Sequence, residues 1–81
     1  MGLQRLHVVG ERTAGGVQEV VVVWQHEDGT RCALFDTGDR FELRIVREHA
    51  IVRQQPVTQV LHALYVLAPA WEVEQTAVQS D

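Results

Sequence analysis

The stretch that decides the fold is residues 17–35, which read VQEVVVVWQHEDGTRCALF. It contains two apolar runs, Val17–Trp24 and Cys32–Phe35, separated by a polar segment with Asp28-Gly29 at its centre. Asp-Gly between two such runs is a strong hairpin signal, because a type I′ turn requires a positive φ at both central residues. The stretch therefore predicts two antiparallel strands joined at Asp28-Gly29.

Further strands are expected on both sides of this hairpin. Residues 3–9 read as a first strand, followed by a glycine-containing loop at 11–16. After the hairpin, Asp36–Arg40 reads as a second tight turn, and Phe41–Val46 alternates between apolar and polar side chains as a half-buried strand does. The pattern indicates a four-stranded antiparallel meander.

The register of the meander follows from its turns. Centring the turns on Ala14-Gly15, Asp28-Gly29 and Gly38-Asp39 brings apolar residues of neighbouring strands into shared rows on one face. A slip of one residue would move a strand's apolar set to the other face, so this coherence supports the register. The predicted core face is lined by Leu6, Val8, Val21, Val23, Cys32, Leu34, Phe41, Leu43 and Ile45, with Gln4, Gln25 and Asp36 in the same rows.

A helix is expected to cover that face. Pro56 suits a first helical turn and Pro69 suits an end, and apolar residues recur between them at helical spacing. Tyr65 and Val66 widen the apolar stripe, so the helix is more apolar than one sheet face requires. Before it, residues 50–52 either extend the fourth strand past a bend or cross over the sheet.

The expected fold class is α+β, a four-stranded antiparallel meander with one C-terminal helix packed on one face. Trp71–Glu74 alternates in polarity and would add a short fifth strand. The alternative is a strongly curled sheet approaching a small barrel. We expect a single domain over residues 1–74 and a frayed polar tail over 75–81.

Composition narrows the class of protein. The chain has 81 residues, a formal net charge of −4 and one cysteine, Cys32. A chain this short buries only about 60% of its unfolded surface, so burial against a partner subunit would add to its stability. The negative charge opposes binding to nucleic acid or to anionic membranes. No signal peptide or membrane-spanning run is evident, and we expect a soluble, cytoplasmic protein.

The second face of the sheet carries the predicted interface. In the register above, an apolar centre on that face is surrounded by basic side chains, which is typical of a protein interface. The interface residues predicted in this way are Val20, Val22, Trp24, Phe35, Arg5, Arg44 and His7. Trp24 and Arg44 are the expected energetic anchors.

Three functions compete for this face. The first is a small, non-catalytic protein-binding module, a homodimer, because two-fold homodimers are the commonest oligomers. The second is a platform for single-stranded nucleic acid, with Trp24 and Phe35 stacking on bases, although the net charge opposes it. The third is a small acidic regulator or inhibitor that docks on a larger protein.

Four histidines and one cysteine are the candidates for metal binding or nucleophilic chemistry. His26, Glu27 and His49 fall at one end of the predicted sheet, but their spacing matches no compact metal motif, and a solvated turn explains them more simply. Cys32 faces the predicted core, where a thiol behaves as a small hydrophobe. The sequence indicates no catalytic residue, no enzyme activity and no cofactor.

Overall fold

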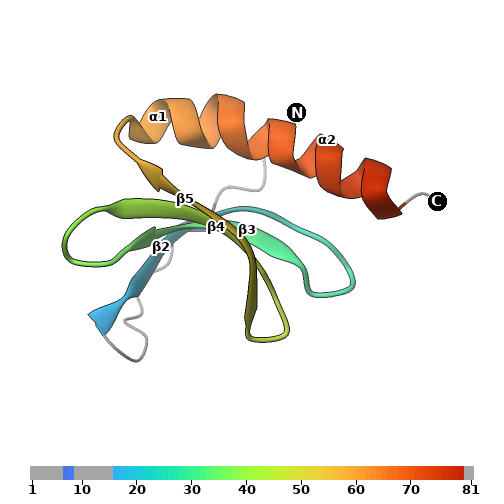
Figure 1. Cartoon of the computed structure of the whole chain (residues 1–81), viewed down its shortest axis with the longest axis horizontal. Coiled ribbons are helices and arrows are strands. Elements are labelled where there is room, and N and C mark those ends of the chain that lie inside the picture. Colours follow the sequence, from blue (N-terminus) through green and yellow to red (C-terminus); the bar gives the residue numbers. More distant parts are fainter. Residues whose placement is uncertain (1–6, 9–15, 80–81) are drawn as a thin grey trace.

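The computed structural model describes residues 7–8 and 16–79, and it shows an antiparallel sheet covered on one face by a helix (Figure 1). The strands are β1 His7–Val8, β2 Gln18–Gln25, β3 Arg31–Asp36, β4 Phe41–Arg47 and β5 Ala50–Val57. They are joined in the order β1-β2-β3-β4-β5. Three helical segments run on from one another: α1 Val60–His62, the π-helical η3 Ala63–Leu67 and α2 Ala68–Gln79.

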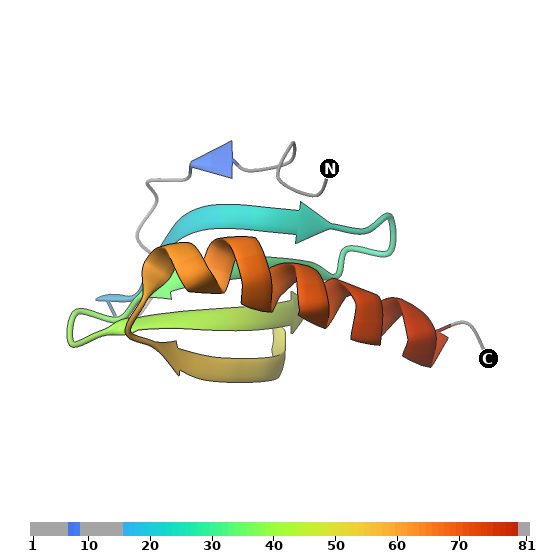
Figure 2. The ribbon, with the colours of Figure 1, turned by 90° about the horizontal axis from the view of Figure 1, so that it is seen from above.

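The α+β class, the antiparallel meander and the C-terminal helix on one face are confirmed. Figure 2 shows the helix lying over the sheet, oblique to the strands but closer to along them than across them. Within the described strands the sheet does not close into a barrel, because β1 and β5 each have one neighbour. The helix continues through Gln79, so the domain boundary that the sequence suggested at residue 75 falls inside a helix.

Two of the three predicted strand registers are confirmed. His7 pairs with Val22 and Val8 with Val21, as the turn at Ala14-Gly15 implied. Between β3 and β4, Leu34 pairs with Leu43 and the rest of the ladder follows the same register. Leu34 and Leu43 are both buried in the main core, which supports the β3–β4 pairing.

The β2–β3 register differs from the prediction at the turn itself. Only Gly29 has a positive φ there, so the connection is a five-residue loop and not a type I′ turn. The Gly29 N–H donates to the His26 carbonyl at 3.0 Å, and the Thr30 N–H donates to Asp28 Oδ1 at 2.9 Å. With the loop closed by these bonds, β2 and β3 pair one residue away from the predicted register, so that Gln25 lies opposite Arg31.

The fifth strand lies elsewhere than predicted. β5 follows β4 through a two-residue turn in which Glu48 and His49 have φ values of 50° and 70°. Trp71–Glu74, predicted as a strand, is helical. Pro56, predicted to start the helix, lies in β5 opposite Glu42, and an edge strand tolerates proline because one side of it makes no ladder bonds.

The helix also passes through Pro69, where it was predicted to end. Proline has no N–H to bond the preceding turn, and its ring crowds that turn. The helix is π-helical just before it, and the Ala68 N–H bonds the Ala63 carbonyl five residues back. This wider turn accommodates the proline without breaking the helix.

The main core lies between the helix and the sheet. From the sheet it takes residues of β2, β3 and β4 that were predicted to face the helix, among them Val23, Leu34 and Ile45. Trp71 of α2 is 1% exposed and completes the core, because the buried stripe of the helix continues past Pro69. The complete buried cluster is Val23, Trp24, Cys32, Leu34, Leu43, Ile45, Val57, Ala63, Leu64, Ala68 and Trp71.

Candidate interaction surfaces

Trp24 does not lie on the second face of the sheet, and that part of the prediction is wrong. Bulges interrupt the β2–β3 ladder, and the one between Val22 and Trp24 brings Trp24 opposite Cys32. A bulge places an extra residue in one strand, so side chains beyond it change faces. Trp24 is 2% exposed in the main core, and its Nε1–H donates to the Ala68 carbonyl at 2.9 Å.

The apolar centre of the second face exists, but it is buried. Val22, Ala33 and Phe35 form a cluster there, with Val17 and Val46 packed against it. Phe35 is only 5% exposed and Val22 only 8%. These side chains therefore offer little apolar area to a partner, and they serve as a second, smaller core.

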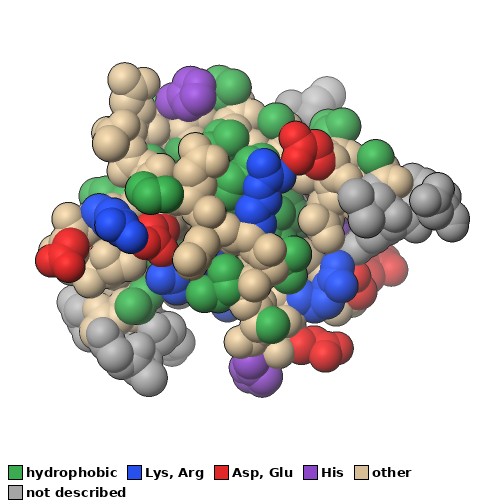
Figure 3. Space-filling model, in the orientation of Figure 1, with side chains coloured by type: hydrophobic (Ala, Val, Ile, Leu, Met, Phe, Trp, Pro, Cys, Tyr) green, Lys and Arg blue, Asp and Glu red, His purple; other side chains and the backbone are tan. Residues whose placement is uncertain are grey.

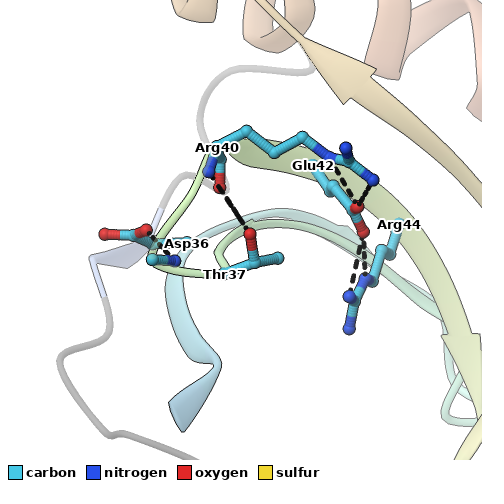
Figure 4. A network of polar contacts seen from close by, with 6 residues as sticks. Asp36, Thr37, Arg40, Glu42 and Arg44 are labelled. Carbon is cyan, nitrogen blue, oxygen red and sulfur yellow. Dashed lines mark hydrogen bonds and ion pairs between the residues drawn. The ribbon is translucent and has the colours of Figure 1, made fainter.

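The basic residues of this face are engaged in ion pairs. Glu42, with an 8% exposed side chain, accepts hydrogen bonds from Arg40 and Arg44, which approach it from opposite sides (Figure 4). The guanidinium of Arg44 also lies 5.0 Å from the centre of the Phe35 ring. The hydrogen bonds from Arg44 and then Arg40 lower the pKa of the Glu42 carboxyl below its ordinary value of 4.5.

The remaining predicted interface residues are scattered or outside the described part. Val20 is half-buried at the other β2 bulge and belongs to neither core cluster. Arg5 and the side chain of His7 lie outside the described residues. Arg31, on the same face, pairs with Glu19 at 2.8 Å. The stacking rings assumed for nucleic acid, Trp24 and Phe35, are therefore both buried, and two nearby arginines are paired.

The histidines of the sheet ends do not form a ligand set. His26 stacks on Trp24 with ring centres 4.8 Å apart, and its Nε2 lies 3.1 Å from Glu72 Oε2. Glu27 and His49 are exposed on different loops. Within the described residues no three His, Cys, Asp or Glu side chains converge as metal ligands.

Cys32 lies in the core, where it was predicted. It is fully buried, and burial raises the pKa of its thiol to about 12. A thiol held neutral in this way is a poor nucleophile. Its surroundings are those of a packing residue.

The exposed apolar surface lies on the helix. Four of the large hydrophobic side chains most open to solvent project from it: Leu61 at 69%, Tyr65 at 47%, Val66 at 54% and Val73 at 69%. We call these four residues the outer helix face. In Figure 3, hydrophobic side chains recur along the upper edge, where the helix lies in Figure 1.

The part of the outer helix face that precedes Glu72 lacks charge, whereas Val73 lies between Glu72 and Glu74. Between Arg53 and Glu72 the sequence contains no Asp, Glu, Lys or Arg. A surface helix normally carries charged and polar residues opposite its buried stripe, and one that is apolar all round is normally buried. The excess apolarity of Tyr65 and Val66 was visible in the sequence, although the predicted interface was assigned to the second face of the sheet.

The edge strand β5 is the other exposed apolar feature. Ile51 is 50% exposed and Val52 is 47% exposed. The edge is interrupted by a bulge near Val46 and by Pro56, and Arg53 stacks on Trp71 at 4.3 Å and pairs with Glu74. Bulges, prolines and charges are the devices that discourage strand pairing at edges.

A shallow pocket lies where β5 meets the helix. It has a volume of about 110 Å³ and is lined by polar side chains, including Gln55, Thr58 and His62, around Ala63 and Leu67. Ligand pockets usually measure about 300–1,000 Å³, so this one is too small to enclose a substrate or cofactor.

Comparison with known proteins gives no match, since no protein-family model, curated protein or solved structure is significantly similar to the chain. Among the described helices, none has both the length and the apolar character needed to cross a membrane.

Proposed function

We propose that the protein is a non-catalytic protein-binding module that pairs with a second copy of itself through the outer helix face. One observation carries this proposal: four large hydrophobic side chains, 47–69% exposed, lie on a helix with no charged residue between Val57 and Trp71. Burial of a surface of this composition away from water is energetically favourable.

Charge favours this face over the rest of the surface. Each chain carries a formal net charge of −4, so two copies repel one another at long range. The helix has no Asp, Glu, Lys or Arg before Glu72, so along that length two copies can approach without like charges of the helices facing one another. Two-fold pairing is also the commonest route by which a small chain gains buried area.

The test compares two substitutions matched in exposure. Val66→Glu places a carboxylate on the outer helix face, and Val52→Glu places one on the exposed edge strand, where exposures are 54% and 47%. The mass of each purified protein is measured by light scattering over a dilution series. Circular dichroism checks that both variants remain folded.

We expect the wild type to reach twice the 9.1 kDa chain mass at high concentration. Val66→Glu is expected to weaken association roughly 100-fold, because it buries an unpaired charge, whereas Val52→Glu leaves it unchanged. A wild type that stays monomeric to millimolar concentration overturns the proposal. Dissociation by Val52→Glu alone would instead assign the interface to β5.

A further inference from the structure

Three residues of the outer helix face and the half-buried Pro69 form a symmetrically spaced stripe. Leu61, Tyr65, Pro69 and Val73 recur every four residues, and the midpoint of the series falls at Leu67, whose own side chain packs against the main core. Because an α-helix has 3.6 residues per turn, side chains four residues apart are displaced progressively around the helix axis. The π-helical turn of η3 is wider, so it offsets part of this displacement. When the helix is reversed about its midpoint, each residue of the stripe therefore takes the position of another residue of the stripe.

The charges of the helix lie at one end only. Glu72 and Glu74 belong to its C-terminal half, and the N-terminal half has no formally charged side chain. If two helices packed in parallel, the carboxylates of both copies would lie side by side. In an antiparallel pair they would lie at opposite ends of the stripe, about 18 Å apart at 1.5 Å per residue, which exceeds the Debye length of about 8 Å.

We infer that two copies pack their helices antiparallel about a two-fold axis near Leu67. This inference rests on the proposed function. Leu61 of each copy then lies against Val73 of the other, and Tyr65 lies against Pro69. The exposed His62 of each copy lies within a turn of Glu72 on the other, a carboxylate whose Oε2 also lies 3.1 Å from His26 Nε2 of its own chain.

Single cysteine substitutions distinguish the two orientations. Leu61→Cys, Val66→Cys and Val73→Cys each add one exposed thiol, and the buried native Cys32 serves as the unreactive background. A disulfide requires Cα atoms within about 7 Å, so mild oxidation reports which positions face one another. The products are separated on a non-reducing gel.

In the antiparallel pair, Val66→Cys lies near the axis and cross-links to itself. Leu61→Cys and Val73→Cys lie far from the axis and cross-link only when the two variants are mixed. The expected yield for the mixture is several times that of either variant alone. The wild type, with Cys32 only, remains uncross-linked.

The outcomes separate this inference from the proposed function. Efficient self-cross-linking of Leu61→Cys and of Val73→Cys, with the wild type a dimer, means a parallel pair and overturns the inference alone. A dimer in which none of the three positions cross-links overturns both the inference and the helix interface. A monomeric wild type overturns the proposed function itself.

Discussion

The two buried tryptophans differ in one respect that can be measured. Trp24 and Trp71 are 2% and 1% exposed in the same core. Trp24 Nε1–H donates to the Ala68 carbonyl, whereas Trp71 Nε1 has no hydrogen-bond partner among the described residues. Replacing each by phenylalanine removes a similar volume and leaves an aromatic ring beside His26 or Arg53, so the indole N–H is the main difference between the two variants.

The expected difference in the free energy of unfolding follows from the environments of the two indole N–H groups. Each substitution loses packing worth roughly 1–2 kcal/mol. Trp24→Phe also loses a hydrogen bond with a net value of about 1 kcal/mol. Trp71→Phe removes an unpaired buried donor, whose burial costs about 1–3 kcal/mol, so this relief offsets the lost packing. We expect Trp24→Phe to destabilise the fold by about 2–4 kcal/mol more than Trp71→Phe.

Urea unfolding followed by circular dichroism measures both free energies of unfolding. The work is done at one low protein concentration, because association of the native state would add to apparent stability. Both rings lie inside the core, so neither substitution alters the outer helix face. If Trp71→Phe lowers the free energy of unfolding as much as Trp24→Phe does, the hydrogen bond from Trp24 to the Ala68 carbonyl does not stabilise the fold.

Three further predictions concern the sheet. Glu42→Gln should lower the free energy of unfolding at pH 7 by about 2 kcal/mol, because it removes the charge from bonds to two arginines. The pKa of Glu42 is lowered on folding, so its contribution is complete above its ordinary value of 4.5 and is lost as the pH falls through the folded value. Acid titration of stability should therefore be shallower in the variant, and an unchanged slope would contradict this. The double change Glu48→Asn and His49→Gly should stabilise the protein by about 1–2 kcal/mol in urea titration, because both residues have positive φ in the turn; no gain would show that the turn is not strained. Cys32 should react with a thiol reagent roughly 100-fold more slowly in the native protein than in urea, since it is buried and its pKa is raised to about 12; rapid native reaction, followed by absorbance, would place it outside the core.

The sequence predicted most of the sheet because alternation and register support one another there. The pairings of β1 with β2 and of β3 with β4 were correct. Phe41–Val46 alternates between apolar and polar side chains, and Gly38 marks the turn before it. The β4–β5 turn was missed for a physical reason. Glu48 and His49 adopt positive φ, a conformation that glycine and asparagine normally signal.

The helix boundaries were missed because proline was read by its usual preference. Pro56 lies in an edge strand and Pro69 lies inside the helix, where η3 widens just before it. Trp71–Glu74 alternates in polarity over four residues, which is too short to distinguish a strand from a helix. The apolar stripe from Leu64 to Trp71 was the better signal.

The interface prediction failed at the β2 bulges. A bulge leaves no clear mark in a run such as Val20–Val23, in which every residue is apolar and β-branched. Its effect is to move Trp24 from the second face into the main core. The excess apolarity of the helix, in contrast, was readable from the sequence and is the feature on which the proposed function depends.

The most direct test of self-association through the outer helix face is an isotope-filtered nuclear Overhauser experiment on a mixture of labelled and unlabelled wild-type chains. Only contacts between two copies give signals in that experiment, and no substitution is needed. The account predicts signals between the methyl groups of Leu61 and Val73, together with signals from the ring of Tyr65. Signals confined to Ile51 and Val52, or none at millimolar concentration, would contradict it.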